Sequence, residues 1–215
     1  FIYASSSSVY GIKKNDHVTE DMKLEPLTDY SKFKVDCENI LLKYMDKNFF
    51  VNILRPATVC GYSKRQRFDL VVNILTNLAY HKREITVYGG NQLRPNITIQ
   101  DMIRAYNILL DDLDQEYNGK IYNVGFENKT VNKLALDVKY IIGDDVKIKK
   151  VSSNDNRSYH ISSEKFYRDF NFKPVNTIQS SILELKKAFE KNIFENSLGN
   201  SEYFNIKKMQ NIKLK

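Results

Sequence analysis

The chain has 215 residues, 42% of them hydrophobic and 12% aromatic, which is typical of a globular protein with an apolar core and excludes a wholly disordered chain. We expect no membrane span, because no stretch approaches the roughly 18 apolar residues that cross a bilayer. We also expect no signal peptide, because the chain opens with neither a basic start nor a long apolar run. The formal net charge of +7 comes largely from lysines spread along the sequence, which argues against nucleic-acid binding but would suit a substrate that carries phosphate.

The first part of the chain predicts a strand, a turn and a long helix. Residues 1–4 end a buried strand, and the serine-rich residues 5–11 form a turn that leaves it. A helix is expected over residues 30–47, with Thr28 or Asp29 as its cap. The helical spacing predicts an apolar face made of Phe33, Cys37, Ile40, Leu41 and Tyr44.

Strands and helices alternate along the rest of the chain. Further strands are expected at residues 49–54, 84–88, 96–99, 120–124 and 146–151. Further helices are expected at residues 68–81, 101–113 (capped by Asp101), 130–142, 163–170 and 177–191. This alternation predicts an α/β fold with a largely parallel sheet, which binds ligands at the carboxyl ends of its strands. From residue 192 onward we expect a polar, irregular segment.

The cysteines and histidines bear on compartment and metal binding. Cys37 and Cys60 have no metal-type spacing, so they predict a chain in the reducing cytoplasm and not a disulfide scaffold. His17, His81 and His160 are scattered, and we expect no zinc site.

Tyr30 and Lys34 form the pair with the clearest chemical potential. Residues four apart share one face of a helix, so the ammonium would favour the phenolate form of the tyrosine and lower its pKa. Such a phenol can exchange a proton with a sugar hydroxyl while hydride moves to or from a nicotinamide. The spacing alone also fits a core tyrosine beside a lysine that reaches to solvent.

The surrounding motifs give this pair its context. ASSSSVYG at residues 4–11 follows a strand, YSKFK opens the helix, and LRPATVCG at residues 54–61 ends the next strand. VYGGNQLRPNITIQDMIRAY, YNVG and NDNRSYHISSEKF follow in order. Together these motifs resemble the extended short-chain dehydrogenases/reductases, in their NAD-dependent epimerase/dehydratase branch. The resemblance extends over about residues 1–190.

The resemblance implies a fold, a cofactor and a substrate class. Residues 1–60 would be the C-terminal part of a Rossmann domain, and residues 61–191 mostly a smaller α/β substrate-binding domain, with Rossmann elements returning at about 95–125. Residues 192–215 would be a polar tail. The cofactor would be NAD, with NADP as an alternative, and the substrate a nucleotide sugar. A homodimer, formed through the helix that carries the tyrosine and the neighbouring helix, is also implied.

The resemblance also assigns site residues. Tyr30 would be the acid/base, Lys34 its partner, and Ser6 the catalytic hydroxyl. Pro56 and Ala57 would pack the nicotinamide. The substrate would contact Ser7, Ser8, Thr58, Asp69, Leu70, Val87, Tyr88, Arg94 and Arg157. Among these, Arg94 would bind phosphate through its guanidinium fork, and Arg157 would replace a second arginine whose position falls on Ser152.

Two features narrow the function further. Dehydratases of this branch usually carry Asp-Glu after the catalytic hydroxyl, whereas this chain has Ser7 and Ser8, which favours an epimerase. The Gly-rich turn of a dinucleotide site is absent, so we expect it upstream of Phe1. A nucleotide-sugar reductase or dehydratase, or a non-catalytic regulatory relative, are the alternatives.

Overall fold

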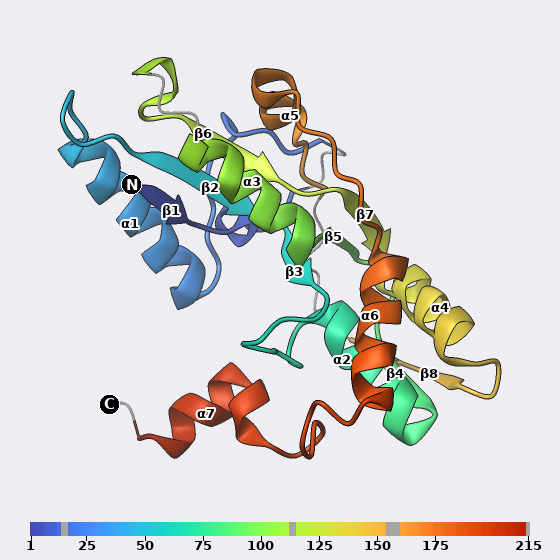
Figure 1. Cartoon of the computed structure of the whole chain (residues 1–215). Helices are drawn as coiled ribbons and strands as arrows, with labels where there is room; N and C mark the ends of the chain where they lie inside the picture. The colour runs from blue at the N-terminus through green and yellow to red at the C-terminus, as the bar shows by residue number, and fades with distance from the viewer. Residues whose placement is uncertain (14–16, 112–114, 154–159, 214–215) are drawn as a thin grey trace.

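The computed structural model describes residues 1–13, 17–111, 115–153 and 160–213. Its strands form three small sheets that are joined by helices along an elongated molecule (Figure 1). None of the helices within those described ranges is long and apolar enough to cross a bilayer.

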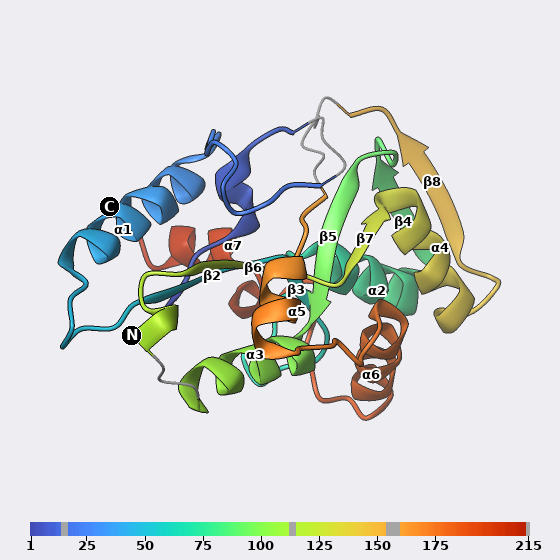
Figure 2. The ribbon, with the colours of Figure 1, turned by 90° about the horizontal axis from the view of Figure 1, so that it is seen from above.

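The first sheet is parallel and has the order β1 (Ile2–Ala4), β2 (Asn52–Pro56), β6 (Ile121–Val124). Helix α1 (Asp29–Tyr44) lies on one of its faces and α3 (Ile99–Asp111) on the other (Figure 2). The predicted α/β class with a Rossmann-like parallel sheet is therefore confirmed.

Helix α1 begins where the sequence predicts, but its predicted packing face is wrong. Thr28 is the N-cap and forms a capping box with Ser31, whose backbone amide lies 3.2 Å from the Thr28 hydroxyl. The apolar residues Phe33 and Tyr44 are each 66% exposed, whereas Ser31 and Glu38 are buried against the sheet. Helical spacing identifies an apolar face, but the sheet surface under α1 carries polar partners and selects the other face.

The second sheet contains β3 (Thr58–Cys60), β5 (Leu93–Thr98) and β7 (Glu127–Thr130). Strand β5 runs parallel to β3 and antiparallel to β7. The sequence did not predict β3 or β7, because three or four residues give too short a period to recognise. Short helices occur in three other segments of the chain: η1 (Ser7–Tyr10) follows β1, η2 (Gln115–Tyr117) precedes β6, and α5 (Glu164–Phe170) precedes α6 (Ile178–Glu190).

Helix α3 differs from its prediction at its start. It begins at Ile99, so Asp101 lies inside its first turn and is not the residue that precedes the helix. The Asp101 carboxylate instead accepts hydrogen bonds from the backbone amides of Val175 and Asn176, the closest at 2.8 Å, and from Arg104. Asp101 therefore ties α3 to the segment that leads into helix α6.

The third sheet pairs β4 (Glu84–Tyr88) with β8 (Lys147–Val151) in parallel. Helices α2 (Val71–Lys82) and α4 (Val131–Ile142) pack beside it, and α6 packs against both of these helices. Their shared core is apolar and includes Val72, Leu75, Ile85, Val87, Leu134, Val138, Ile178 and Ile182.

The segment after residue 192 is more ordered than predicted. It contains η3 (Ser201–Tyr203) and α7 (Asn205–Asn211), so the prediction of irregular structure is wrong there. Aromatic residues of this segment pack on Phe68, whose backbone amide donates to the Tyr203 carbonyl at 2.9 Å. The predicted domain limits at residues 60 and 191 stay predictions.

Candidate functional site

The hydroxyl of Ser6 lies at the carboxyl end of strand β1. Ser6 is the N-cap of η1, where its Oγ accepts a hydrogen bond from the Ser8 amide at 3.1 Å. The same Oγ lies 2.8 Å from the Ser8 Oγ. The turn predicted for this segment thus fixes two adjacent hydroxyls at the edge where a parallel sheet binds ligands.

Tyr30 and Lys34 lie in the first two turns of α1, next to the same strand end. The Lys34 ammonium donates to the Ala4 carbonyl at 2.7 Å, two residues before Ser6. It lies 5.5 Å from the centroid of the Tyr30 ring and 4.9 Å from that of Tyr3. The Tyr30 side chain is 58% exposed. The structure therefore places an accessible phenol and an ammonium at the exit of β1.

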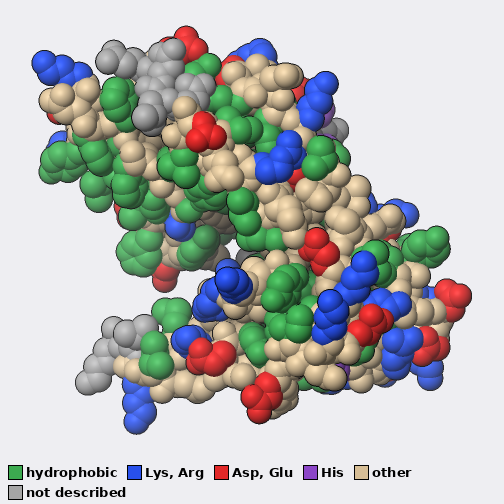
Figure 3. All heavy atoms as spheres, in the orientation of Figure 1, with side chains coloured by type: hydrophobic (Ala, Val, Ile, Leu, Met, Phe, Trp, Pro, Cys, Tyr) green, Lys and Arg blue, Asp and Glu red, His purple; other side chains and the backbone are tan. Residues whose placement is uncertain are grey.

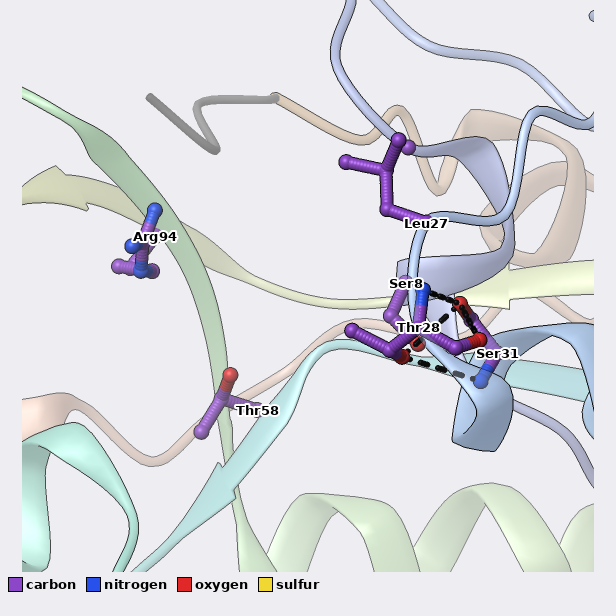
Figure 4. Close-up of a pocket in the computed structure, with 7 residues that line it drawn as sticks. Ser8, Leu27, Thr28, Ser31, Thr58 and Arg94 are labelled. Atoms are coloured by element: carbon purple, nitrogen blue, oxygen red, sulfur yellow. Dashed lines mark hydrogen bonds between the residues drawn. The ribbon is translucent and has the colours of Figure 1, made fainter. Parts of the chain in front are cut away.

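A cavity of about 170 Å³ opens beside this cluster. Figure 4 shows Ser8, Thr28 and Ser31 on one side of it, with Thr58 of β3 and Arg94 of β5 across from them. Gly11 and Leu27 complete the described lining. These residues supply hydroxyls and one guanidinium, and no carboxylate is among them. Three predicted substrate residues, Ser8, Thr58 and Arg94, thus share one cavity.

A buried polar cluster behind the cavity was not anticipated from the sequence. The Arg55 guanidinium of β2 binds the Glu38 carboxylate of α1, with Nη2 2.6 Å from Oε2. Arg55 also donates to the Tyr10 hydroxyl at 2.9 Å. Burial raises the pKa of Tyr10 to about 12, although Arg55 partly offsets that effect. The signal available for this cluster was an arginine that directly follows the apolar run of the strand predicted at residues 49–54.

Other predicted site residues have partners elsewhere. The Asp69 carboxylate binds Arg67, with Oδ1 2.9 Å from Nε, and accepts the backbone amide of Asn205 at 3.0 Å. Leu70 borders a second cavity of about 160 Å³, which Arg65 and Arg67 also line. The C-terminal segment therefore docks on the predicted substrate turn.

The remaining predicted site residues differ in their solvent exposure. Ala57 and Val87 are buried in apolar clusters, and neither lines the two cavities described above. Ser7 is likewise buried, whereas Pro56 is half-buried and Tyr88 is exposed. Arg157 lies outside the described residues. The ligand roles assigned to all of these residues remain predictions.

Comparison with known proteins agrees with this fold and motif order. Residues 1–125 match the model of the NAD dependent epimerase/dehydratase family. The chain is 31% identical to the uncharacterized UDP-glucose epimerase YtcB of Bacillus subtilis, over 66% of this chain and 45% of that protein. It is 27% identical to the dTDP-D-glucose 4,6-dehydratase of Mus musculus, over 89% of this chain and 56% of that protein.

Solved structures give the same picture. UDP-glucuronic acid 4-epimerase of Bacillus cereus, in complex with UDP-glucuronic acid and NAD, superposes with a TM-score of 0.79 at 26% identity. That match covers 90% of this chain and 62% of the epimerase, so the chain spans roughly half to two thirds of such relatives. The chain belongs to the NAD dependent epimerase/dehydratase family.

Proposed function

We propose that the protein carrying this chain is an NAD-dependent nucleotide-sugar epimerase that uses Ser6, Tyr30 and Lys34. The observation that carries this proposal is the cavity between η1, α1, β3 and β5, with hydroxyls at one wall and Arg94 at the other. A sugar fits the hydroxyl side, and a pyrophosphate fits a guanidinium fork. The Bacillus cereus epimerase, which was solved with both NAD and a nucleotide sugar, supports the same pairing of ligands.

The residues at the exit of β1 fit the nicotinamide half of NAD. The Lys34 ammonium has three N–H groups and uses one of them on Ala4, so others can bind a ribose hydroxyl. Pro56, half-buried at the end of β2, would border the nicotinamide ring. NAD would supply the acceptance and return of a hydride at a sugar carbon.

Proton transfer would fall to Tyr30. Its exposed side chain, as the phenolate, takes a proton from a sugar hydroxyl and, as the phenol, later returns it, while Ser6 holds the reacting oxygen. Lys34 stabilises the phenolate that acts as the base, because its positive charge lies beside the ring. Inversion follows when the keto sugar turns over before it is reduced again on its other face.

Epimerisation is favoured over dehydration by the cavity lining. Loss of a hydroxyl as water needs a group that protonates the leaving oxygen. The described lining offers Ser8, Thr28, Ser31 and Thr58, and a serine hydroxyl cannot act as that acid near neutral pH. The dehydratase relatives keep dehydration as the alternative that an experiment must separate.

We also propose a homodimer and a cytoplasmic location. The exposed apolar residues Phe33, Ile40 and Tyr44 lie on α1, where Figure 3 shows hydrophobic side chains gathered at the surface. Covering them with a second copy would remove that apolar surface from water. Both cysteines are free thiols, in keeping with a reducing compartment. Sedimentation should give a dimer that Phe33→Ser with Tyr44→Ser dissociates, and a monomeric wild type would contradict this.

The proposed activity can be tested with the full-length gene product. We would add NAD and a panel of UDP-, GDP-, dTDP- and CDP-sugars, and identify products by NMR. We expect one sugar to gain an inverted hydroxyl without loss of water. Tyr30→Phe should lower turnover about 100- to 10,000-fold. Tyr140→Phe, which alters an exposed tyrosine on α4, is the matched control and should keep wild-type turnover.

Each possible result decides between the alternatives. A 4-keto-6-deoxy product would establish a dehydratase, and no turnover with retained cofactor binding would favour a regulatory relative. Equal activity in Tyr30→Phe and the wild type would exclude the proposed role of the phenol.

A further inference from the structure

We propose that the buried Glu38–Arg55 ion pair and the Ser5 hydroxyl set the distance between Ser6 and the Tyr30–Lys34 pair. They would be positioning residues, which act on the reaction through the groups that they hold. This inference rests on the proposed function, because it concerns the geometry of that site.

The end of strand β1 and helix α1 are linked directly by hydrogen bonds. Two consecutive residues at the end of β1 bind two residues one turn apart on α1. The Ala4 carbonyl accepts from Lys34 at 2.7 Å, and the Ser5 hydroxyl donates to the Glu38 carboxylate. Tyr30, Lys34 and Glu38 follow at intervals of four, so they share one face of the helix. The turn that carries Tyr30 is therefore held against the segment that carries Ser6.

The Arg55 guanidinium fixes the Glu38 carboxylate through two hydrogen bonds. Arg55 Nε lies 3.0 Å from Glu38 Oε1, and Arg55 Nη2 lies 2.6 Å from Oε2. The two side chains are only 3% and 2% exposed, so water does not compete for these bonds. A bidentate contact sets the direction of the carboxylate as well as its distance. Helix α1 is thereby attached to the central strand β2 at one defined position.

The far end of the Ser6 segment is also bonded to this ion pair. Arg55 Nη1 lies 2.9 Å from the Tyr10 hydroxyl, which donates to Asn123 Oδ1 of β6 at 2.7 Å. Tyr10 ends η1, the short helix that Ser6 caps. Ser5 on one side of Ser6 and Tyr10 on the other are therefore bonded to the same ion pair.

Stability alone does not account for such a pair. A buried ion pair contributes little more than an apolar replacement of similar volume, because its desolvation offsets its attraction. Reaction geometry is much more sensitive, since a displacement of about 1 Å can lower a rate about 100-fold. The network converges on the two segments that carry the proposed chemistry, which points to positioning as its role.

The test uses Ser5→Ala in the full-length enzyme, with the nucleotide sugar found to be turned over. This change removes the bond to Glu38 but leaves the ion pair intact, so the protein should still fold. We expect kcat to fall about tenfold or more, with KM within about threefold of wild type. Tyr10→Phe, which removes the second attachment, should behave in the same way.

Ser197→Ala is the matched control. Ser197 is as buried as Ser5, at 3% exposure, and its hydroxyl donates to Asn77 Oδ1 at 2.7 Å, which joins the C-terminal segment to helix α2. It should lose similar stability and keep wild-type kcat. A Ser5→Ala enzyme with wild-type kcat, or an equal loss in Ser197→Ala, would overturn the inference.

A second measurement separates positioning from general damage. In a Tyr30→Phe background, Ser5→Ala should lower kcat by less than about threefold, because the hydroxyl that Ser5 helps to position is already gone. If Ser5→Ala lowers kcat by the same factor in the wild type and in Tyr30→Phe, the inference is overturned while the proposed function stays intact. If Tyr30→Phe itself keeps full activity, it is the proposed function that fails.

Discussion

Helix α1 and helix α4 show two ways of attaching a helix to the fold. Helix α4 buries Leu134, Ala135 and Val138 in an apolar core that it shares with α2 and α6. Helix α1 buries Ser31 and Glu38, while Phe33 and Tyr44 remain exposed. Apolar packing is non-directional and tolerates small shifts, whereas hydrogen bonds and ion pairs fix direction and distance. Helix α4 also buries Asp137, which pairs with Lys129 at 2.9 Å, but its other buried residues are apolar. The buried residues of the helix that carries the proposed chemistry make directional contacts.

The largest effect on stability should come from breaking the ion pair on one side. Glu38→Gln leaves the buried Arg55 charge uncompensated and should lower the free energy of unfolding by about 3–5 kcal/mol, measured by denaturant titration. Glu38→Met combined with Arg55→Met should recover most of that loss, because no charge remains buried. A single variant as stable as wild type would show that the pair is solvated.

An apolar truncation in α4 gives the contrasting case. Leu134 is fully buried, so Leu134→Ala should lower the free energy of unfolding by about 3 kcal/mol through lost burial and the cavity left behind. Turnover per folded molecule should stay within about twofold of wild type. A large loss of kcat here would mean that apolar packing also sets the site, and the contrast between the two helices would fail.

Acid should weaken the attachment of α3 that Asp101 provides. Burial opposes ionisation of Asp101, but the Asn176 amide, Arg104 and the Val175 amide outweigh it and hold its pKa below the usual range. A carboxyl with a depressed folded pKa stabilises the protein above its unfolded pKa of about 4 and loses that contribution as pH falls through the folded value.

Asp101→Asn removes this titration. We expect the wild type to lose more stability than the variant as the pH falls below about 4, because only the wild type must protonate this carboxylate. Denaturant titrations of both proteins across that range measure it. Parallel pH profiles would show that Asp101 makes no such contribution.

The smallest effect compares the caps of the two helices. Thr28 caps α1 and Thr130 caps α4, each by accepting a backbone amide at 3.2 Å. Replacing either threonine by alanine should lower the free energy of unfolding by about 1 kcal/mol. Only Thr28→Ala should also lower kcat, because it loosens the turn that carries Tyr30. Equal kcat values in the two variants would show that the start of α1 needs no fixed geometry.

Most of the fold could be predicted because the apolar residues of its strands and helices recur at clear intervals. Strand β4 and helix α4 have clear apolar patterns and clear ends, and the structure has them within a residue of their predicted limits. The start of α1 was predictable from Thr28, a good N-cap residue. The packing face of α1 was not, because a helical period does not say which surface it will meet.

The site could be predicted only in part, for a related reason. Tyr30 and Lys34 are close in sequence, so their spacing is visible. Ser5, Glu38 and Arg55 come from three separate elements, and only the folded sheet brings them together. The docking of Asn205 on Asp69 joins residues that are still farther apart in the chain.

The most direct measurement is a structure of the full-length protein with NAD and its nucleotide-sugar substrate. We expect Tyr30 Oη and Ser6 Oγ to lie within about 3.2 Å of the same sugar hydroxyl, with the substrate phosphates on Arg94. A complete complex in which every sugar hydroxyl stays out of reach of Tyr30 would contradict the assignment of Tyr30 as the acid/base.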